Sequence, residues 1–343
     1  MKDQARRPEQ THNDATPGSS PIESRSSAVT GSTPSKEEST VEDSTSLLGA
    51  GGLAVADPSG PQRLTGTREW SPHNCNVVKG CRNACLYCYA KSMAIRFKRK
   101  TPETWHIEEP CLDMAVRMAR KQPTSIMFPS THDITPGCLD VCLQALDLLL
   151  GAGHHILIVS KPHLSCVAEI CRRFSGFKAQ ILFRFTIGSL DPDTLRFWEP
   201  NAPSPDERLA SLRLAHSLGF ETSVSCEPML DAHAVEIVRG VLPFVTETIW
   251  LGKVNQLRQR LRMNGVLTPE VATRADALIE SQNDEAMAGL YEQLRHCPKV
   301  RWKESIKKVV GLPLMVLERG HPRGNGNMTD TRTGPHGPTT QGA

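Results

Sequence analysis

The sequence lacks the features that mark exported and membrane-spanning proteins. No apolar run among its 343 residues approaches the ~20 residues that a membrane span needs. No apolar segment that could direct export stands near the N-terminus. The chain has eleven cysteines, an odd number. Together with the lack of an export segment, this number favours a reducing compartment, in which the cysteines do not form disulfides. These absences predict a cytoplasmic protein without a membrane partner.

A strong charge of either sign is also missing, because the formal net charge is only +3. Residues 1–60 hold five basic and nine acidic residues, so the 35 basic and 28 acidic residues that follow carry a net +7. Basic clusters occur at residues 96–100 and at Arg258, Arg260 and Arg262. Solvated helix faces explain such clusters more often than phosphate contacts do. The charge therefore permits a nucleic-acid partner without showing one.

Both ends of the chain lack a repeating apolar face. Residues 1–62 are rich in Ser, Thr, Pro, Gly and acidic side chains, and residues 318–343 are rich in Gly, Pro, Thr and His. Segments of this kind cannot bury enough apolar surface to offset their chain entropy. We therefore predict two disordered tails, at 1–62 and 318–343, around one core domain at 63–317, a length that suits an α/β barrel.

Within the core, short apolar runs alternate with amphipathic helices about six times. Strands are expected at residues 76–79, 125–128, 155–159, 179–187, 222–226 and 248–251, with a short terminal strand at 301–303. Such alternation indicates parallel strands joined by helical crossovers. Six units are fewer than the eight of a closed barrel, so the sequence predicts an α/β fold with a partial (β/α)6 TIM-type barrel. A doubly wound flat sheet is the alternative.

A helix start and a set of polar residues stand out in this pattern. Ser204 is suited to be an N-cap, with Pro205 at the first helical position and Glu207 three residues after the cap. Polar residues follow the apolar strands, where parallel α/β folds bind ligands. This rim set is Ser130–Asp133, Ser160, Lys161, Thr186, Ser189, Glu227, Lys253 and Asn255.

The strongest local signal is three cysteines, Cys81, Cys85 and Cys88, at C-x3-C-x2-C spacing directly after Gly80. Three thiolates from one loop can hold an iron–sulfur cube and leave one of its irons open. Zinc with Cys75 as a fourth ligand is an alternative, but structural zinc favours paired short spacings, and no second C-x2-C occurs in the chain. The third alternative is that no metal binds. It does not explain why three cysteines would stand in a polar loop, where they would contribute little to packing.

This motif, with Tyr87 before its third cysteine, resembles the signature of radical S-adenosylmethionine (SAM) enzymes. The stretch from about residue 65 to 312 is similar to the spore photoproduct lyase-like branch, also described as DNA repair photolyase-like. The similar segments are residues 85–90, 159–161, 184–187 and 198–209.

The resemblance implies that the three cysteines hold a [4Fe-4S] cluster whose fourth iron is chelated by SAM. Tyr87 would pack beside the adenine, Lys161 would meet the SAM carboxylate, and Thr186 would stand at the SAM site with Asp133 on the same rim. The family's chemistry is reductive cleavage of SAM to a 5′-deoxyadenosyl radical that abstracts hydrogen from a substrate. The implied partners are SAM, an electron donor such as flavodoxin or ferredoxin, and nucleic acid as a candidate substrate.

One departure limits what the resemblance implies. The branch's lyase has a hydrogen-donating cysteine three positions before an aspartate, and this chain has Ser130 there, before Asp133. A serine O–H bond is too strong for that task, and Cys138 could serve only if its loop turned it inward. The catalytic residues and the substrate are therefore not assigned. The alternative function is a non-catalytic zinc- or cluster-binding module that holds nucleic acid.

Overall fold

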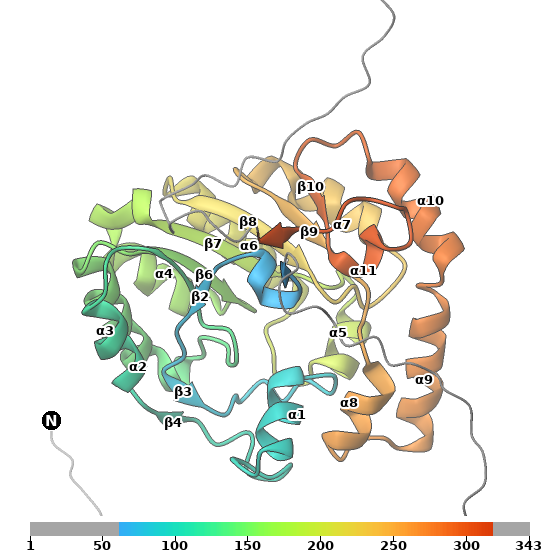
Figure 1. Ribbon diagram of the computed structural model, residues 1–343, viewed down its shortest axis with the longest axis horizontal. Helices are drawn as coiled ribbons and strands as arrows, with labels where there is room; N and C mark the ends of the chain where they lie inside the picture. Colours follow the sequence, from blue (N-terminus) through green and yellow to red (C-terminus); the bar gives the residue numbers. More distant parts are fainter. Residues whose placement is uncertain (1–61, 318–343) are drawn as a thin grey trace, which may run out of the picture. The chain divides into compact units, whose positions relative to one another are not determined.

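A seven-stranded sheet in which every neighbouring pair is parallel forms the centre of the protein (Figure 1). The computed structural model describes residues 62–317, so the predicted tails, apart from Gln62, lie outside the described residues. In spatial order the strands are β10 (Val300–Trp302), β9 (Ile249–Leu251), β8 (Glu221–Cys226), β7 (Ile181–Thr186), β6 (His155–Ser160), β5 (Ser125–Phe128) and β2 (His73–Asn74).

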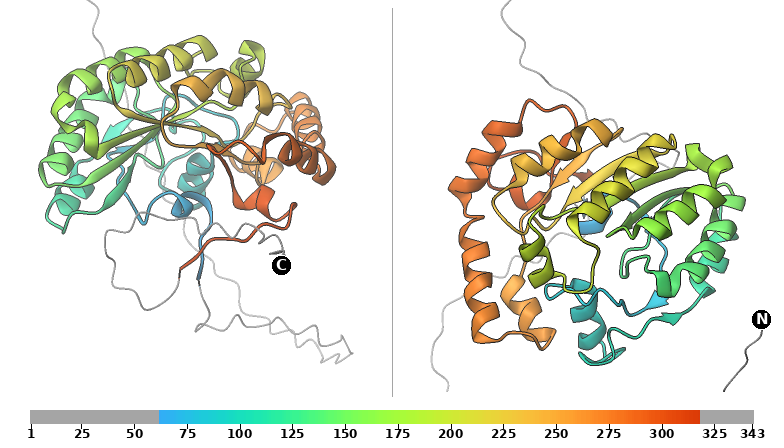
Figure 2. Two further views of the ribbon diagram at one scale, coloured as in Figure 1. Left: turned by 90° about the horizontal axis from the view of Figure 1, so that it is seen from above. Right: turned by 180° about the vertical axis from the view of Figure 1, so that it is seen from behind.

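The α/β prediction is confirmed, with an open rather than a closed barrel, because β10 and β2 do not pair with each other. Helices follow the strands and cover the outer face of the sheet (Figure 2). The helices of residues 62–317, of which only some cover that face, are α1 (Tyr89–Arg96), α2 (Asp113–Ala119), α3 (Leu139–Gly151), α4 (Leu164–Arg173), α5 (Pro192–Trp198), α6 (Pro205–Ser217), α7 (Ala234–Val241), α8 (Leu257–Met263), α9 (Pro269–Glu280), α10 (Asp284–Leu294) and α11 (Glu304–Lys307). Among residues 62–317, no helix has the length and apolar character needed to cross a bilayer.

Short elements complete the domain. The 3-10 helices are η1 (Gly66–Glu69), η2 (Pro136–Cys138), η3 (Ser175–Gln180) and η4 (Leu242–Phe244). Two small antiparallel pairs join β1 (Gln62–Arg63) to β11 (Val316–Leu317) and β3 (Val78–Lys79) to β4 (Glu109–Pro110). The predicted helix start is confirmed, since the Ser204 hydroxyl accepts the Glu207 N–H at 3.2 Å at the beginning of α6.

The first predicted strand was misplaced. The parallel sheet uses the two residues of β2, and the Cys75 N–H still donates to the Met127 carbonyl of β5. Pairing ends there because the Asn76 side chain accepts the N–H groups of Ser130 and Thr131 at 2.7 and 2.9 Å. The chain then leaves the sheet, and Val78–Lys79 pairs with β4 instead. The terminal strand predicted at 301–303 is confirmed as β10.

The two faces of the sheet have different compositions. On the outer face, alternate residues such as Ile158, Phe183 and Val224 belong to the main buried core under the helices. On the concave face, Met127 and Leu157 of β5 and β6 pack with other apolar groups, but the next strands become polar. This alternation follows from the period of two in a strand. The concave face is therefore where a polar site can form.

A buried arginine fills part of that concave face. Arg184 of β7 lies 5.0 and 5.5 Å from the ring centroids of Trp70 and Trp250, and its Nε donates to the Ser223 hydroxyl at 2.9 Å. Burial lowers the pKa of Arg184 to about 9. Lys303, after β10, lies over Trp70 and donates to the Gly66 carbonyl of η1 at 2.7 Å. These contacts fix η1 inside the half-barrel, so that it forms one wall of the cavity described next.

Candidate functional site

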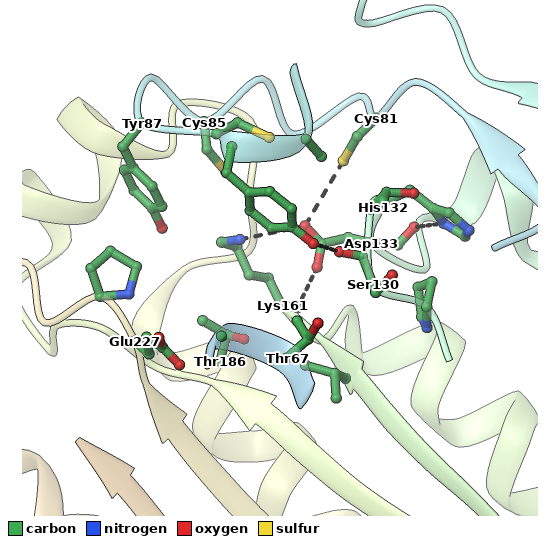
Figure 3. Close-up of a pocket in the computed structure, with 18 of the residues that line it drawn as sticks. Thr67, Cys81, Cys85, Tyr87, Ser130, His132, Asp133, Lys161, Thr186 and Glu227 are labelled. Carbon is green, nitrogen blue, oxygen red and sulfur yellow. Dashed lines mark hydrogen bonds and ion pairs between the residues drawn. The ribbon is translucent and has the colours of Figure 1, made fainter. Parts of the chain in front are cut away.

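A cavity of about 500 Å³ opens between the carboxyl ends of the strands, the cysteine loop and η1 (Figure 3). This volume lies within the range of about 300–1,000 Å³ that small-molecule sites occupy. The three motif cysteines and all four predicted cofactor residues line it: Cys81, Cys85, Cys88, Tyr87, Asp133, Lys161 and Thr186. Figure 3 shows Cys81, Cys85 and Tyr87 on the loop at one side, with Lys161, Thr186 and Glu227 at the strand ends opposite.

The cysteine loop is held by backbone contacts from both sides. The Cys81 N–H donates to the Trp105 carbonyl at 3.0 Å. The Asn264 side-chain amide donates to the carbonyls of Leu86 and Cys88 at 2.9 and 3.0 Å. Cys88 is also the N-cap of α1, and its sulfur accepts the Lys91 N–H at 3.4 Å. The loop is therefore fixed at its two ends before any ligand binds.

Gly80, directly before Cys81, has a φ of +103°, which glycine adopts readily and other residues rarely do. A β-carbon at this position would lie 2.2 Å from the Ile107 carbonyl oxygen and 2.7 Å from that of Trp105. Both contacts are with backbone atoms, which cannot move without shifting the segment that holds Cys81. Only glycine fits here.

Replacing Gly80 by alanine is therefore expected to displace the cysteine loop and to prevent stable iron binding. The measurement is iron and sulfide content after anaerobic reconstitution of the purified variant. Gly289→Ala, in α10, is the matched control because no atom lies within 4 Å of its new β-carbon. Iron loading of Gly80→Ala equal to that of the control would contradict the assignment.

The three thiols form one buried electrostatic group. Burial raises the pKa of Cys81, Cys85 and Cys88, and the negative charge of Asp133 raises all three further. Such thiols are inert when free, but a cluster requires their deprotonated form and stabilises it. The donor set fits a cluster with one iron left open, because three sulfurs face one cavity.

Cys75 does not join this group. It is fully buried in the main core and does not line the cavity that the three motif cysteines share. The four-thiolate zinc site that uses Cys75 therefore lacks its fourth ligand. The described residues place no other cysteine on the cavity wall.

Asp133 connects the cysteine loop to the strand ends. One carboxylate oxygen accepts the Lys161 N–H at 2.7 Å and the Ser160 hydroxyl at 3.1 Å. The other accepts the Asn83 side-chain amide at 2.9 Å, and the Cys81 sulfur lies 3.9 Å from it. The carboxylate thus ties β6 to the loop that carries the first cysteine.

Lys161 lies between two carboxylates, with its ammonium 3.5 Å from Asp133 and 4.0 Å from Glu199. Burial alone would disfavour the charged forms of both Lys161 and Asp133. Their mutual attraction outweighs it, so the pKa of Lys161 lies well above its usual value and that of Asp133 below. Lys161 is therefore a fixed cation facing the cavity.

Glu199 was not predicted as a site residue. Its carboxylate is fully buried, accepts the Tyr87 hydroxyl and forms an ion pair with the equally buried Arg208. Tyr87 is thereby oriented by a hydrogen bond, while its ring lines the cavity. Glu199 lies in the 198–209 segment, one of those similar to the spore photoproduct lyase-like branch, and this similarity could have marked it as a site residue. Its chemical role was hidden because its partners come from α6, β6 and the cysteine loop.

Ser130 lines the cavity, as its position in the sequence predicts. Its hydroxyl contacts the Asn76 amide at 3.0 Å, and its carbonyl accepts the Tyr89 hydroxyl. Cys138 is turned away from the cavity into the core, where Cys142, His132 and Thr135 donate hydrogen bonds that lower its pKa to about 4. Cys138 therefore does not replace the missing donor.

The remaining wall comes from late parts of the chain. Glu227, with a pKa raised by burial, lies 3.4 Å from the Lys303 ammonium, and Lys253 also lines the cavity.

The three arginines of α8 do not form one surface. Arg258 forms an ion pair with Asp276, whereas Arg260 faces the cavity, 6.0 Å from the Tyr89 ring, and Arg262 is exposed to solvent.

Comparison with known proteins finds a family model that matches part of the chain. Residues 75–232 match the family model described as the radical SAM superfamily. These residues, a little under half of the chain, carry the similarity to the radical SAM superfamily. Enzymes of this superfamily use a [4Fe-4S] cluster and SAM. The matched segment contains the cysteine loop, Asp133, Lys161 and Glu199.

More distant similarities accompany this radical SAM match. A protein of Acidianus two-tailed virus, "Uncharacterized protein ORF301", is 26% identical over 172 residues, which are 47% of this chain and 56% of the viral protein. The chain therefore matches little more than half the length of that relative. Spore photoproduct lyase complexed with dinucleoside spore photoproduct aligns at 14% identity and a TM-score of 0.45, over 70% of this chain and 78% of the lyase. Streptococcus suis SuiB bound to S-adenosylmethionine aligns at 12% identity and a TM-score of 0.37, over 70% of this chain and 50% of SuiB.

Proposed function

We propose that Cys81, Cys85 and Cys88 hold the [4Fe-4S] cluster and that the neighbouring cavity holds SAM for reductive cleavage. The observation that carries this proposal is the convergence on one cavity of three cysteines, two buried and one half-buried, and of the fixed Lys161–Asp133 pair. When bound, cluster and SAM together supply a 5′-deoxyadenosyl radical for hydrogen abstraction. The protein's own part is to position SAM and to exclude water.

The residues at the strand ends divide the binding of SAM among them. Lys161 is a buried cation suited to the SAM carboxylate, and Thr186 presents a hydroxyl at the end of the neighbouring strand. Tyr87 offers an aromatic ring to the adenine, with its hydroxyl held by Glu199. Asp133 keeps Lys161 charged and in place.

The test of this proposal is anaerobic reconstitution followed by addition of dithionite and SAM. The expected product is 5′-deoxyadenosine, formed by a brown protein that contains iron and sulfide. A colourless protein that carries stoichiometric zinc and forms no 5′-deoxyadenosine would support the alternative, a non-catalytic binding module.

Replacing Lys161 by methionine is expected to weaken SAM binding by about 10- to 100-fold, because one charge-assisted contact is worth roughly 1.5–3 kcal/mol. Cluster content should stay unchanged, since Lys161 is not a cluster ligand. The measurement is SAM binding to the reconstituted protein by equilibrium dialysis. Lys253→Met is the control, because it removes the same charge from another wall of the cavity. Equal SAM affinity in the two variants would exclude Lys161 as the carboxylate ligand.

For the substrate, we propose a phosphate-bearing molecule, with nucleic acid as the candidate and a spore photoproduct lyase-like reaction as the related chemistry. The support is the cationic wall at Arg68, Lys253 and Arg260, which faces the cavity apart from the Lys161 pair. Binding of a DNA oligonucleotide that weakens with salt and with Arg260→Ala is the expected result. DNA binding that is unaffected by salt and by Arg260→Ala would show that this cationic wall is not the contact surface.

A further inference from the structure

A hydrogen-bond donor without an acceptor lies beside the first motif cysteine. Trp105 is buried in the wall of the cavity, and its indole Nε1 has no hydrogen-bond partner in the described part of the chain. Most buried polar groups in proteins are paired, because an unpaired one costs free energy. The Trp105 indole therefore marks a place where a bound group can supply the acceptor.

Backbone and side-chain contacts hold Trp105 against Cys81. The Trp105 carbonyl accepts the Cys81 N–H at 3.0 Å, which fixes the two residues next to each other. Their side chains pack with Ala90 and Ala94 in one small buried cluster. Gly80 permits this approach, since a β-carbon there would lie 2.7 Å from the Trp105 carbonyl oxygen. The indole thus belongs to the part of the wall that carries the first motif cysteine.

A second unpartnered atom belongs to the same loop but has the opposite chemistry. Asn83, two residues after Cys81, has a side-chain Oδ1 that is buried without a partner among residues 62–317. The Asn83 amide nitrogen already donates to Asp133 at 2.9 Å. Thiolates and sulfides accept hydrogen bonds, so they cannot satisfy Oδ1, which is also an acceptor. Indole only donates, so of these two atoms only Trp105 Nε1 can bond to sulfur.

Iron binding changes what the Cys81 sulfur requires. As a thiol, it donates toward the Asp133 carboxylate, 3.9 Å away (Figure 3). As an iron ligand it is a thiolate, which has no proton to donate and carries negative charge. It then repels Asp133 and accepts hydrogen bonds instead. The Cys88 sulfur already has a donor, the Lys91 N–H at 3.4 Å, and Trp105 is the donor packed against Cys81.

We propose that Trp105 donates its indole N–H to the sulfur of Cys81 when that sulfur holds iron, and that this bond raises the reduction potential of the cluster. The inference rests on the proposed function, because it needs a cluster at the three motif cysteines. Reduction adds an electron, and part of its negative charge resides on the sulfurs. An N–H donor therefore stabilises the reduced cluster more than the oxidised one.

The first test compares Trp105→Phe with Trp70→Phe in the reconstituted full chain. Phenylalanine keeps an aromatic ring in the wall and removes the N–H. Trp70 is the matched control, because its Nε1 is also buried without a partner in the described structure, but beside η1 on another wall of the cavity. Iron content is measured first. The cluster is then titrated with dithionite in the absence of SAM, and its reduced form is followed by electron paramagnetic resonance (EPR).

For Trp105→Phe we expect unchanged iron content and an equilibrium constant for one-electron reduction that is about tenfold smaller, a shift of ~59 mV to lower potential. The Trp70→Phe constant should stay within about twofold of that of the unchanged protein. Because SAM is absent, neither result depends on SAM binding or cleavage.

A second measurement does not depend on how the Trp105 variant folds. The unchanged protein is labelled with nitrogen-15 in its tryptophan indoles, and the reduced cluster is studied by pulsed EPR. The expected result is a magnetic coupling to an indole nitrogen. The coupling should persist in Trp70→Phe and in Trp198→Phe, which replaces the tryptophan that packs with Cys85.

An unchanged potential in an iron-loaded Trp105→Phe protein would overturn the inference, and so would an equal shift in Trp70→Phe. Absence of the indole coupling in the unchanged protein, or its loss in Trp198→Phe, would overturn it as well. If Trp105→Phe loads no iron, the coupling decides. A cluster that forms without cleaving SAM would contradict the proposed function and leave the titration valid, whereas a chain that binds no cluster would overturn both.

Discussion

Replacing Cys85 by serine is expected to remove the iron–sulfur cluster and with it all detectable cleavage of SAM. Cys85 is buried in the wall of the cavity, and its thiol is one of three that face the same space. Serine is nearly the same size, so the fold should survive while the ligand set falls to two. The measurement is iron and sulfide per chain after reconstitution, together with 5′-deoxyadenosine formed from SAM and dithionite.

No other cysteine of the described residues can take the place of Cys85 without moving the backbone. Cys75 and Cys138 are held in the main core, and neither lines the cavity. Cys297→Ser, a change in a half-buried cysteine outside the cavity, is the control and should load iron normally. A Cys85→Ser protein with the full iron content of this control would contradict the ligand assignment.

Replacing Glu199 by alanine should be the most destabilising of the proposed changes. The carboxylate and the Arg208 guanidinium are both fully buried, so the variant leaves an unpaired charge in the interior. Loss of one partner of a buried ion pair costs about 3–5 kcal/mol of the free energy of unfolding. The measurement is denaturant unfolding of the full chain, read by circular dichroism.

Two further variants separate charge from shape at this position. Glu199→Gln keeps an acceptor for the Tyr87 hydroxyl and should lose less stability than Glu199→Ala. Glu236→Ala, on the exposed surface of α7, is the control and should change the free energy of unfolding by less than about 1 kcal/mol. A Glu199→Ala variant as stable as this control would show that the buried ion pair does not contribute to the free energy of unfolding.

The positions of Asp133, Lys161 and Thr186 were predictable because all three stand near the carboxyl ends of apolar strands: Asp133 in the loop after β5, Lys161 directly after β6 and Thr186 at the end of β7. In a parallel sheet, all such positions meet at one edge, so strand order is not needed to bring them together. The three cysteines were predictable because their spacing is local.

The contacts of Glu199 and Arg260 were not predictable from the sequence in this way. The partners of Glu199 come from three different elements, and such long-range pairing leaves no periodic signal. Arg260 was grouped with Arg258 and Arg262 because α8 was not foreseen. Once that helix forms, residues two apart point to different sides, so one arginine enters the cavity while another meets Asp276. The first strand was misplaced because two residues are too few to show alternation.

We propose that three cysteines hold a cluster whose fourth iron is left for SAM. Mössbauer spectroscopy of the protein reconstituted with iron-57 tests it directly, before and after SAM is added. We expect one of the four irons to change its signal when SAM binds, and the other three to stay the same. Four irons that all keep their signals at saturating SAM, or a protein that takes up zinc in place of iron, would contradict the claim.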